Sequence, residues 1–575
     1  MLALAALAGL ACLGHARAQP LPSHPHPPPL QPPLRPTATY DEFLSHFPER
    51  GASDGRRRAA IYERNRAAIA AHNAEADAGQ HSFWLAINEF ADLTHEEWKA
   101  AMLPPAQPPA ARHHHARAAL PPPPPGPSKV DWTAATTCKQ PNGCVSAVKN
   151  QVRLPDPCPP PPPLPTPLGG LDAQGYCGAC WAFSAAGAME SAFAISSGKL
   201  LNASVQQLLD CQAGQSACAG GDEVDAFLYA MANGGVGRQE DYPYVSGVNQ
   251  LSTPCCVSPD PSKPVSCVKP GLSIEGFDEL PTEDEASLAA FVAESPVSIN
   301  INASRQLMQF YSYGVYSVDC APTTDHGVLA VGYGSGGTDT MRYDFGASNR
   351  NKTECGTWCK NCWGNPSCGG CVEWHFDDKT QICTVEIELQ GDWWKVKNSW
   401  GAGWGQHGYF YLSRGKHGPA GQCGIASSPS RPVAKQEGGK SLGWHPKGYQ
   451  MVYDCHGLGV PLNCSQPHGG PTHPNNHPHG SCSFVCTSAN TCIAEAAAFC
   501  DTLSKCGGFG YSDAWVATNV QFFEGGSASD TAVSCDTDWT AWCKPGKCGP
   551  PMDWRHPYGL CTPPPPPPPP LSPSQ

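Results

Sequence analysis

A cysteine at the start of an apolar segment is the residue in this chain best suited to nucleophilic chemistry. Residues 181–197 hold few helix breakers apart from Gly187, which predicts a long buried helix whose first turn carries Cys180. A thiol there lies at the positive end of the helix dipole, and a protonated histidine nearby would lower its pKa enough to hold a thiolate. A thiolate is the nucleophile that peptide-bond cleavage needs. The alternative is that Cys180 is one more half-cystine, but Cys177 stands three residues earlier and offers itself for a bridge.

Two further polar residues could complete such a centre. His326 begins the apolar run 327–331, which predicts a strand, and Asn398 lies in the glycine-rich segment 396–405. A histidine that opens a strand is ordinarily a core or surface residue, and a glycine-rich segment is ordinarily a turn. A histidine oriented by an asparagine would nevertheless supply the proton transfers that a cysteine nucleophile requires.

The sequences around these residues resemble the papain family of cysteine peptidases. Residues 174–184 contain Cys-Gly-Ala-Cys-Trp, and residues 325–334 and 396–405 resemble the family's histidine strand and asparagine segment. The resemblance implies that the second cysteine of the first motif is the nucleophile and that the histidine is the general base. It also implies that Asn398 accepts the second ring N–H, with Trp400 covering that bond from water.

An oxyanion hole is implied as well, made by the side chain of Gln174 and the backbone N–H of the nucleophile. Gln174 stands six residues before the nucleophile, as in the family. Residues 149–151, Lys-Asn-Gln, also match the family's lead-in to that glutamine, and the proline-rich residues 152–174 separate the two matches. We hypothesise that residues 152–174 are a retained intron, whose removal would join Gln151 to the next glycine and restore the family's spacing. Sequencing the mature transcript tests this.

A second departure from the family is the long interval between the histidine and the asparagine. Residues 335–392 are therefore interpreted as an insertion, looped out between two paired strands so that the contact between histidine and asparagine stays intact. Two Cys-x-x-Cys pairs in it would suit zinc, but they are close together and the compartment is oxidising, which favours disulfides. The cysteines of the insertion are Cys355, Cys359, Cys362, Cys368, Cys371 and Cys383.

The resemblance carries disulfide pairings too. It implies that Cys177 pairs with Cys218, that Cys211 pairs with Cys255 or Cys256, and that Cys320 pairs with Cys423. Cys138 and Cys144 are expected to form an additional local pair.

Substrate preference in the family depends mainly on the pocket for the second residue before the cut. The motif Ala-Cys-Ala-Gly-Gly at 217–221 places Asp222 and Glu223 in its wall, which makes the lining polar and acidic. We therefore predict weaker aliphatic preference and better tolerance of Arg or Lys. The alternative is that both carboxylates face solvent. The expected substrate-binding residues are Gly220, Gly221, Asp222, Glu223, Asn300, Thr324, Asp325, Gly327, Trp400 and Ser428.

An inhibitory propeptide is indicated before the catalytic part. Asp54, Arg58, Ile61, Tyr62, Asn65, Ile69 and Asn73 resemble the ERFNIN helix of cathepsin L-type propeptides, and their spacing of three and four places them on one helical stripe. Residues 86–92, Ala-x-Asn-x-Phe-x-Asp, resemble the companion motif. The resemblance implies that this domain blocks the cleft until it is cut off within residues 104–129.

The C-terminal part is cysteine-rich and carries two motifs, at 492–500 and 506–512, that resemble a PAN/apple-type module. Such modules bind protein or glycan. The alternative is a disulfide-rich spacer.

Composition limits the classes of function. A net charge of −13 argues against a nucleic-acid partner, and 30 cysteines indicate an oxidising compartment. Residues 2–13 form a short apolar run followed by Ala-Arg-Ala, which predicts a signal peptide and entry into the secretory pathway, toward a lysosome, a vacuole or the extracellular space. We expect no membrane span, no cofactor and no metal. The histidine run 113–115 could hold a metal, but a solvated linker is favoured.

The expected fold is α+β: a papain-like, two-part fold with a helical half and a β-barrel-like half, a small helical propeptide domain and a Cys-rich C-terminal extension. The expected function is a thiol-dependent endopeptidase, made as an autoinhibited zymogen, with protein and peptide substrates. A catalytically silent binding protein on the same scaffold is the competing class. The expected segments are a signal peptide at 1–18, a Pro/His-rich unstructured spacer at 19–36, the propeptide at 37–103, the linker at 104–129, the peptidase domain at 130–433, the Cys-rich module at 438–561 and a polyproline tail at 562–575.

Overall fold

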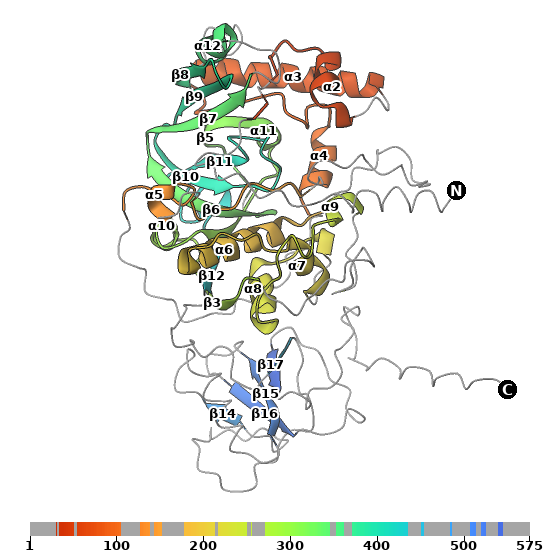
Figure 1. Cartoon of the computed structure of the whole chain (residues 1–575), viewed down its shortest axis with the longest axis vertical. Helices are drawn as coiled ribbons and strands as arrows, with labels where there is room; N and C mark the ends of the chain where they lie inside the picture. Colours follow the sequence, from red (N-terminus) through yellow and green to blue (C-terminus); the bar gives the residue numbers. More distant parts are fainter. Residues whose placement is uncertain are drawn as a thin grey trace, which may run out of the picture. The chain divides into compact units, whose positions relative to one another are not determined.

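The computed structural model describes most of the chain between residues 30 and 434 and five strands beyond it (Figure 1). The described residues up to 434, apart from 231–233, belong to one compact unit, and the strands from residue 450 onward belong to a second. The described residues are 30–31, 34–50, 55–104, 127–138, 143–151, 177–212, 217–249, 255, 271–321, 323–345, 352–361, 371–434, 450–453, 483–485, 506–512, 519–524 and 539–543.

The propeptide domain is mainly helical. Its longest helix, α3, buries one stripe of side chains, and the polar members of that stripe bind the segment that follows: Asn65 Nδ2 donates to the carbonyls of Ala91 and Leu93, both at 2.8 Å. Thr39 and Thr94 each form a capping box at the start of a short helix, which fixes where α2 and α4 begin. The elements are α2 (Tyr40–His46), η1 (Pro48–Arg50), α3 (Gly55–Asp77), β1 (Phe83–Leu85) and α4 (His95–Met102).

The helical half of the catalytic part is built around α6 (Cys180–Ser197), which is buried along most of its length. The helix ends at Gly198, whose φ of 73° is the left-handed conformation that glycine adopts most easily. Gly187 lets the helix approach the β-rich half closely, since an ideal Cβ there would lie 3.1 Å from Leu329 Cδ2. The other elements are α5 (Ala135–Cys138), α7 (Val205–Cys211), η2 (Ala217–Ala219), α8 (Glu223–Ala232) and α9 (Ser246–Asn249).

The β-rich half is a nine-stranded sheet in the order β1-β5-β11-β10-β6-β4-β12-β3, with β2 also paired to β6. Strand β1 of the propeptide belongs to this sheet, pairing antiparallel with β5. Together the two halves confirm the expected α+β two-part fold. The elements are β2 (Val130–Asp131), β3 (Ile274–Glu279), α10 (Glu285–Val292), β4 (Val297–Ile301), α11 (Gln306–Phe310), β5 (Tyr311–Tyr316), β6 (His326–Ser335), β10 (Asp392–Lys397), β11 (Tyr409–Ser413), η3 (Gln422–Gly424) and β12 (Ser430–Ala434).

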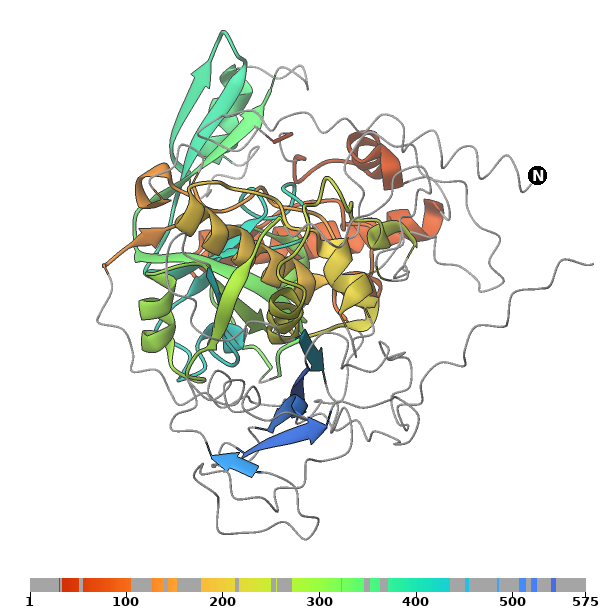
Figure 2. The same ribbon diagram turned by 60° about the horizontal axis from the view of Figure 1, so that its bottom comes forward.

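The insertion between β6 and β10 is folded rather than merely looped out. It forms a three-stranded antiparallel sheet in the order β7-β9-β8 with a helix, α12, against β8 (Figure 2). Cys355 and Cys383 form a disulfide within it, and Cys371 is also disulfide-bonded. The elements are β7 (Thr338–Asp344), α12 (Lys352–Asn361), β8 (Cys371–Asp377) and β9 (Ile382–Glu388). Cys359 lies in α12, and Cys362 and Cys368 lie outside the described residues.

The second unit contains a five-stranded antiparallel sheet in the order β13-β17-β15-β16-β14. The motif at 492–500 lies outside the described residues, as do the expected signal peptide at 1–18 and the expected polyproline tail. Among the helices that the structure describes, none is both long and apolar enough to cross a membrane. The strands are β13 (Gln450–Tyr453), β14 (Ser483–Val485), β15 (Cys506–Ser512), β16 (Asn519–Glu524) and β17 (Trp539–Cys543).

Candidate active site

The cysteine of the site is the first residue of α6. Cys177, three residues earlier, is bridged to Cys218, and Cys180 carries a free thiol that is 2% exposed. Gly327 comes directly after His326, and its backbone amide faces the thiol of Cys180, where it lowers the pKa of the thiol against the larger effect of burial. An ideal Cβ on Gly327 would lie 3.1 Å from the backbone N of Trp181, so glycine is the residue that fits between α6 and β6 here. The helix start and the head of β6 are thereby brought together.

The histidine of the site is held by the asparagine across two paired strands. His326 Nε2 donates to Asn398 Oδ1 at 2.8 Å, since the amide oxygen can only accept. The proton of the neutral ring therefore sits on Nε2, and Nδ1 is left with its lone pair and has no hydrogen-bond partner in the described structure. That nitrogen is free to take a proton from a thiol.

The indole of Trp400 stacks on this imidazole, with ring centroids 4.7 Å apart and planes at 26°. Trp400 is fully buried, as is Trp404, whose ring meets it edge-on at 4.8 Å. The two rings exclude water from the bond between histidine and asparagine, which strengthens it and fixes the ring orientation.

The strand register explains why the insertion does not disturb this pair. Ser335, at the end of β6, lies opposite Asp392, and Leu329 lies opposite Lys397. His326 and Asn398 therefore meet at one end of the strand pair, and the insertion leaves from the other end. The expected intact contact follows from antiparallel pairing.

Burial sets the protonation of the catalytic pair in this closed form. It raises the pKa of the Cys180 thiol to about 12, because the thiolate would lose its hydration, and it lowers the pKa of the His326 imidazole to about 4 for the same reason. The backbone amides beside the sulfur and the hydrogen bond from the histidine to Asn398 oppose these shifts but have a smaller effect. In the covered enzyme, burial therefore favours the neutral thiol and the neutral imidazole.

Gln151 occupies the position beside the nucleophile's loop. The side chain is fully buried, with Nε2 donating to the carbonyl of Cys177 at 3.2 Å and Oε1 accepting from Ser399 Oγ at 2.7 Å. Its backbone N–H donates to the Ser399 carbonyl at 2.8 Å. Gln174, together with residues 152–173, lies outside the described residues.

Behind the histidine strand lies a buried charge network that sequence reasoning missed. Glu190, within the apolar α6, accepts from Ser146 Oγ, from Lys149 Nζ at 2.6 Å and from the Ala203 N–H at 2.8 Å. Lys397 Nζ donates to the same Ser146 hydroxyl at 2.9 Å, and burial lowers the pKa of Lys397 to about 8. The network anchors the residue that precedes Asn398. The sequence signal for this network was Glu190 itself, a single charged residue within an apolar helix.

The expected substrate pocket is partly assembled. Glu223 is 2% exposed and its Oε2 accepts from Asn300 Nδ2 at 3.0 Å, while that amide also reaches Ser428 Oγ at 3.3 Å. Gly221 packs against Trp181, where an ideal Cβ would lie 2.4 Å from the indole. Asp222 is half-buried and accepts from the Val224 N–H at 2.9 Å, so it caps the start of α8. The alternative that both carboxylates face solvent is therefore wrong for Glu223.

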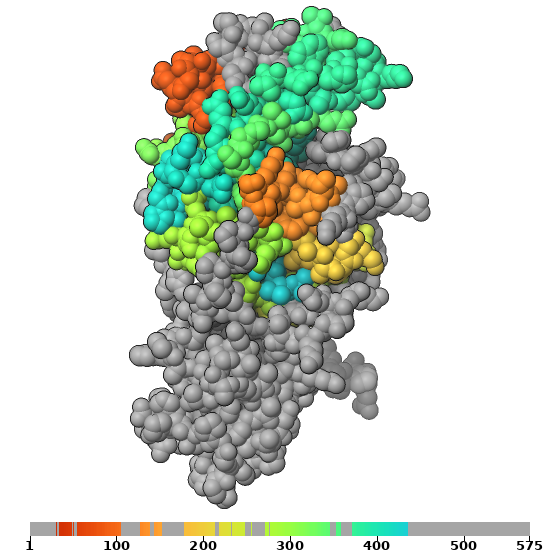
Figure 3. Space-filling view, turned by 90° about the vertical axis from the view of Figure 1, so that its left-hand side faces the viewer, coloured from red at the N-terminus to blue at the C-terminus, as the bar shows by residue number. Residues whose placement is uncertain are grey.

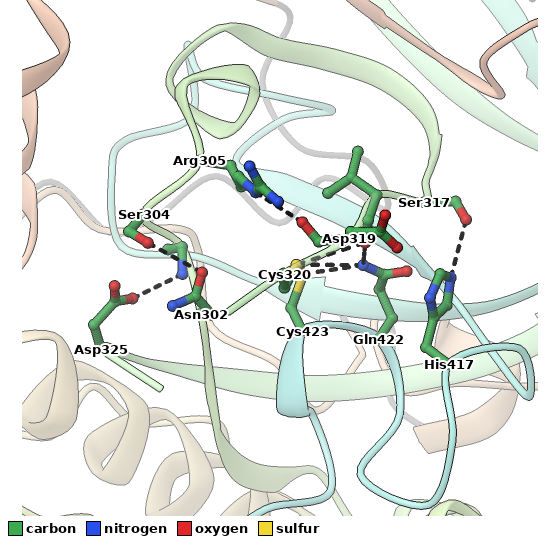
Figure 4. The surroundings of a disulfide bond; sticks show 12 residues. Asn302, Ser304, Arg305, Ser317, Asp319, Cys320, Asp325, His417, Gln422 and Cys423 are labelled. Atoms are coloured by element: carbon green, nitrogen blue, oxygen red, sulfur yellow. Dashed lines mark hydrogen bonds between the residues drawn. A yellow bond between two sulfur atoms is a disulfide. The ribbon is translucent and has the colours of Figure 1, made fainter. Parts of the chain in front are cut away.

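The residues before His326 are tied down by a disulfide between Cys320 and Cys423 (Figure 4). Asp325 accepts from the Ala303 N–H at 2.7 Å, and burial raises the pKa of its carboxyl. Thr324 lies close to Gly424, where an ideal Cβ would come within 3.1 Å of its methyl group. The other bridges join Cys211 to Cys255 and Cys138 to Cys144.

The propeptide covers the site at several points. Trp98 of α4 meets Trp400 edge-on at 5.2 Å, and Asn88 Nδ2 donates to the Gln309 carbonyl at 2.8 Å. Where α4 ends, the Met102 carbonyl accepts from Gln151 Nε2 at 3.0 Å. Pro104 then lies against Gly178, whose ideal Cβ would be 3.0 Å from it. The chain thus crosses directly over the loop that carries the nucleophile.

One group of potential metal ligands occurs among the described residues, and it lies in the propeptide. The ligand atoms of His72, Glu75 and His81 lie within 4.8 Å of one another. His81 Nε2 already contacts Glu75 Oε2 at 3.1 Å, and the two imidazoles stack at 4.4 Å.

Comparison with known proteins agrees with this geometry. The family model described as papain family cysteine protease matches residues 167–433, and the cathepsin propeptide inhibitor domain (I29) matches residues 40–98.

Oryzain beta chain of Oryza sativa subsp. japonica is 31% identical over 402 residues, which cover 69% of this chain and 66% of the rice protein, slightly less than two thirds of its length. Procathepsin L of Mus musculus is 30% identical over 389 residues, covering 67% of this chain and 87% of the mouse protein. Among solved structures, the proform of the ragweed pollen allergen Amb a 11 cysteine protease aligns with 28% identity and a TM-score of 0.46, over 69% of this chain and 94% of that one.

Proposed function

We propose, from the premise that this chain belongs to the papain family of cysteine proteases, that it is the zymogen of a thiol-dependent endopeptidase of the secretory pathway. The observation that carries the proposal is the free thiol of Cys180 beside a histidine whose Nε2–H is held by Asn398 at 2.8 Å. The disulfides fit an oxidising compartment, a lysosome, a vacuole or the extracellular space.

The chemistry follows from the orientation of the histidine. Once the cleft is open to water, burial no longer favours the neutral forms, and the thiol proton passes to His326 Nδ1. The thiolate of Cys180 attacks the scissile carbonyl carbon, forming a C–S bond and an oxyanion. His326 then gives the proton to the leaving amine as the C–N bond breaks. Water, deprotonated by the same nitrogen, hydrolyses the acyl-enzyme and regenerates the thiol.

We assign the oxyanion donors to the Cys180 backbone N–H and the side chain of Gln151 in place of Gln174. The support is the hydrogen bond from Gln151 Nε2 to the Cys177 carbonyl, which keeps the amide next to the nucleophile's loop. Removal of the propeptide frees this N–H group from the Met102 carbonyl. The assignment agrees with the hypothesis that residues 152–174 are a retained intron.

The propeptide is proposed as the enzyme's own inhibitor, removed after a cut in the 104–129 linker. The support is its path over the nucleophile's loop, where Pro104 packs on Gly178. A propeptide in this position excludes both substrate and water from Cys180 and His326.

For specificity, we propose that Glu223 favours Arg or Lys as the second residue before the cut. Its carboxylate is buried in the pocket wall next to Asn300 and Ser428, and a negative charge there favours a basic substrate side chain. For residues 438–561 we propose a role in binding protein or glycan, resting on the two PAN/apple-like motifs alone.

Turnover of fluorogenic peptides at mildly acidic pH tests the central proposal. The processed chain should hydrolyse them, and processed Cys180→Ala should not. A processed, folded wild-type chain that cleaves no peptide would instead identify a silent binding protein.

A further inference from the structure

The apolar core of the insertion is completed by residues from outside it. Met341, Phe345 and Val385, among others of the insertion, form one buried cluster with Ala76 and Trp84 of the propeptide and with Tyr313 of β5. Trp84 is 4% exposed and its indole stacks on the Tyr313 ring at 5.2 Å with the planes at 14°. An insertion of this size has too little interior to bury its own apolar surface. The propeptide therefore supplies part of the core.

A second contact comes from residues N-terminal to the propeptide domain. Leu30, inside the segment expected to be an unstructured spacer, pairs with Tyr343 of β7 in a parallel bridge. The Leu30 N–H donates to the Arg342 carbonyl at 2.9 Å, and the Leu30 carbonyl accepts from the Asp344 N–H at 2.7 Å. Its side chain packs on the same apolar cluster.

An ion pair lies next to this bridge. Arg35 Nη2 contacts Glu354 Oε1 of α12 at 2.6 Å, with both side chains partly exposed. On the face that Figure 3 shows, the orange-red surface of the propeptide domain lies next to the green and turquoise surface that includes the insertion.

The insertion is fixed to the catalytic part, so it can act as a rigid support. The Arg342 N–H donates to His407 Nε2 at 3.0 Å, and Gln406 Nε2 donates to Asp339 Oδ2 at 2.8 Å. The disulfide between Cys355 and Cys383 ties α12 to the sheet. Contacts made on the insertion therefore hold the propeptide to the enzyme.

We propose that the insertion is a second docking surface for the propeptide, which keeps the propeptide bound after the 104–129 linker has been cut. The proposal rests on the proposed function, in which the propeptide is the inhibitor. Residues 19–137 contain no cysteine, so a cut propeptide is held by non-covalent contacts alone. Because the cleft and the insertion bind one rigid domain, release from either leaves it at high local concentration for rebinding. Cutting the linker does not by itself free the cleft.

The test uses the full proenzyme with Cys180→Ala, so that it cannot degrade its own propeptide, and with a recognition site for a sequence-specific protease placed in the linker. After cleavage at neutral pH, gel filtration over a range of concentrations gives the apparent Kd of the propeptide fragment. Leu30→Asp places a charge against the apolar cluster, and Gln31→Asp places the same charge on the neighbouring exposed residue. We expect Leu30→Asp to weaken binding on the order of tenfold and Gln31→Asp to leave it unchanged.

Equal dissociation of the two variants would overturn the proposal. A second pair of variants is independent of the apolar cluster. Arg35→Glu should weaken binding by roughly twofold to fivefold, and adding Glu354→Arg should restore it. Failure of that restoration would also count against the insertion as a docking surface. Since turnover is not measured, these outcomes are separate from those that test whether the enzyme is active.

Discussion

Besides the pairing of β1 with β5, the propeptide contacts two regions of different character, the catalytic cleft and the insertion. In the cleft the propeptide accepts a hydrogen bond from the Gln151 side chain, to which we assign a catalytic role, and its Trp98 packs edge-on against Trp400. On the insertion it joins an apolar cluster and a backbone bridge at Leu30. The cleft keeps its own hydrogen bonds when the propeptide leaves, whereas the insertion loses part of its core.

Blocking the cleft and holding the propeptide in place are thus properties of different regions of the enzyme. The cleft determines what the propeptide blocks, and the insertion adds to how tightly it is held. Changes in the cleft should therefore affect turnover first, and changes in the insertion should affect stability first.

The largest expected effect lies in the cleft. Gln151→Ala in the processed enzyme should lower kcat on the order of 10²–10³-fold, because one oxyanion donor is lost where no water replaces it. Gln174→Ala is the matched control and should change kcat by less than about threefold. Peptide turnover measured for both variants decides between them, and the opposite ranking would return the oxyanion role to Gln174.

In the insertion, loss of its disulfide should affect stability without affecting catalysis. The double variant Cys355→Ala and Cys383→Ala should lower the free energy of opening of β8 and β9 by about 2–4 kcal/mol, since the unfolded segment gains freedom. Hydrogen exchange of the β8 and β9 amides measures this. The kcat of the processed enzyme should stay within about twofold of wild type. A comparable loss of turnover would show that the insertion shapes the cleft.

A smaller effect is expected in the pocket. Glu223→Gln keeps the shape and the hydrogen bond to Asn300 but removes the charge, so the ratio of kcat/KM for Arg over Leu substrates should fall on the order of tenfold. Asp222→Asn removes a neighbouring charge while keeping a helix cap, and it should move the ratio less. A wild-type enzyme that strongly prefers Leu would contradict the acidic-pocket account.

The smallest expected effect is on the pH dependence of the stability of the propeptide, through the contact of His72 with β1. His72 Nε2 contacts the Phe83 carbonyl at 3.1 Å, and burial lowers the pKa of His72 below its ordinary value of 6.5. Because the folded state favours the neutral ring, its stabilising contribution is complete above about pH 6.5 and is lost as the pH falls toward the lowered pKa. A glutamine at this position does not titrate. When His72→Gln is added to the Cys180→Ala proenzyme, the Tm of the propeptide should therefore fall less between pH 7 and pH 5 than it does in Cys180→Ala alone. If the dependence of Tm on pH is unchanged in the variant, His72 does not cause the loss of stability at low pH.

The sequence predicted the cleft well because its chemistry needs particular residues. The motifs around Cys180, His326 and Asn398 name residue types that only this reaction requires, and antiparallel pairing explains why a distant histidine and asparagine meet. In the structure His326 bonds to Asn398, and Gly327 lies against the first turn of α6, which carries Cys180. The oxyanion glutamine was ambiguous because two candidates precede the cysteine, and our proposal of Gln151 rests on its hydrogen bond to the Cys177 carbonyl.

The docking of the propeptide on the insertion could not be predicted. The apolar residues of β7 and β9 carry no functional motif, and their partners Leu30 and Trp84 lie far away in the sequence. The prolines around Leu30 indicated an unstructured spacer, yet Leu30 itself keeps the N–H and the carbonyl that form the bridge to β7. The effect of burial on the pKa of the Cys180 thiol likewise depends on the assembled domain and has no signal in the sequence.

Labelling with an epoxysuccinyl thiol-protease inhibitor tests whether Cys180 is a nucleophile that the bound propeptide blocks and that becomes reactive once the propeptide has been removed. Mass spectrometry of digested protein should find the label on Cys180 in the processed enzyme, and neither in the intact proenzyme nor in processed Cys180→Ala. Labelling of another residue, equal labelling before and after processing, or no labelling of a folded processed enzyme would contradict the account.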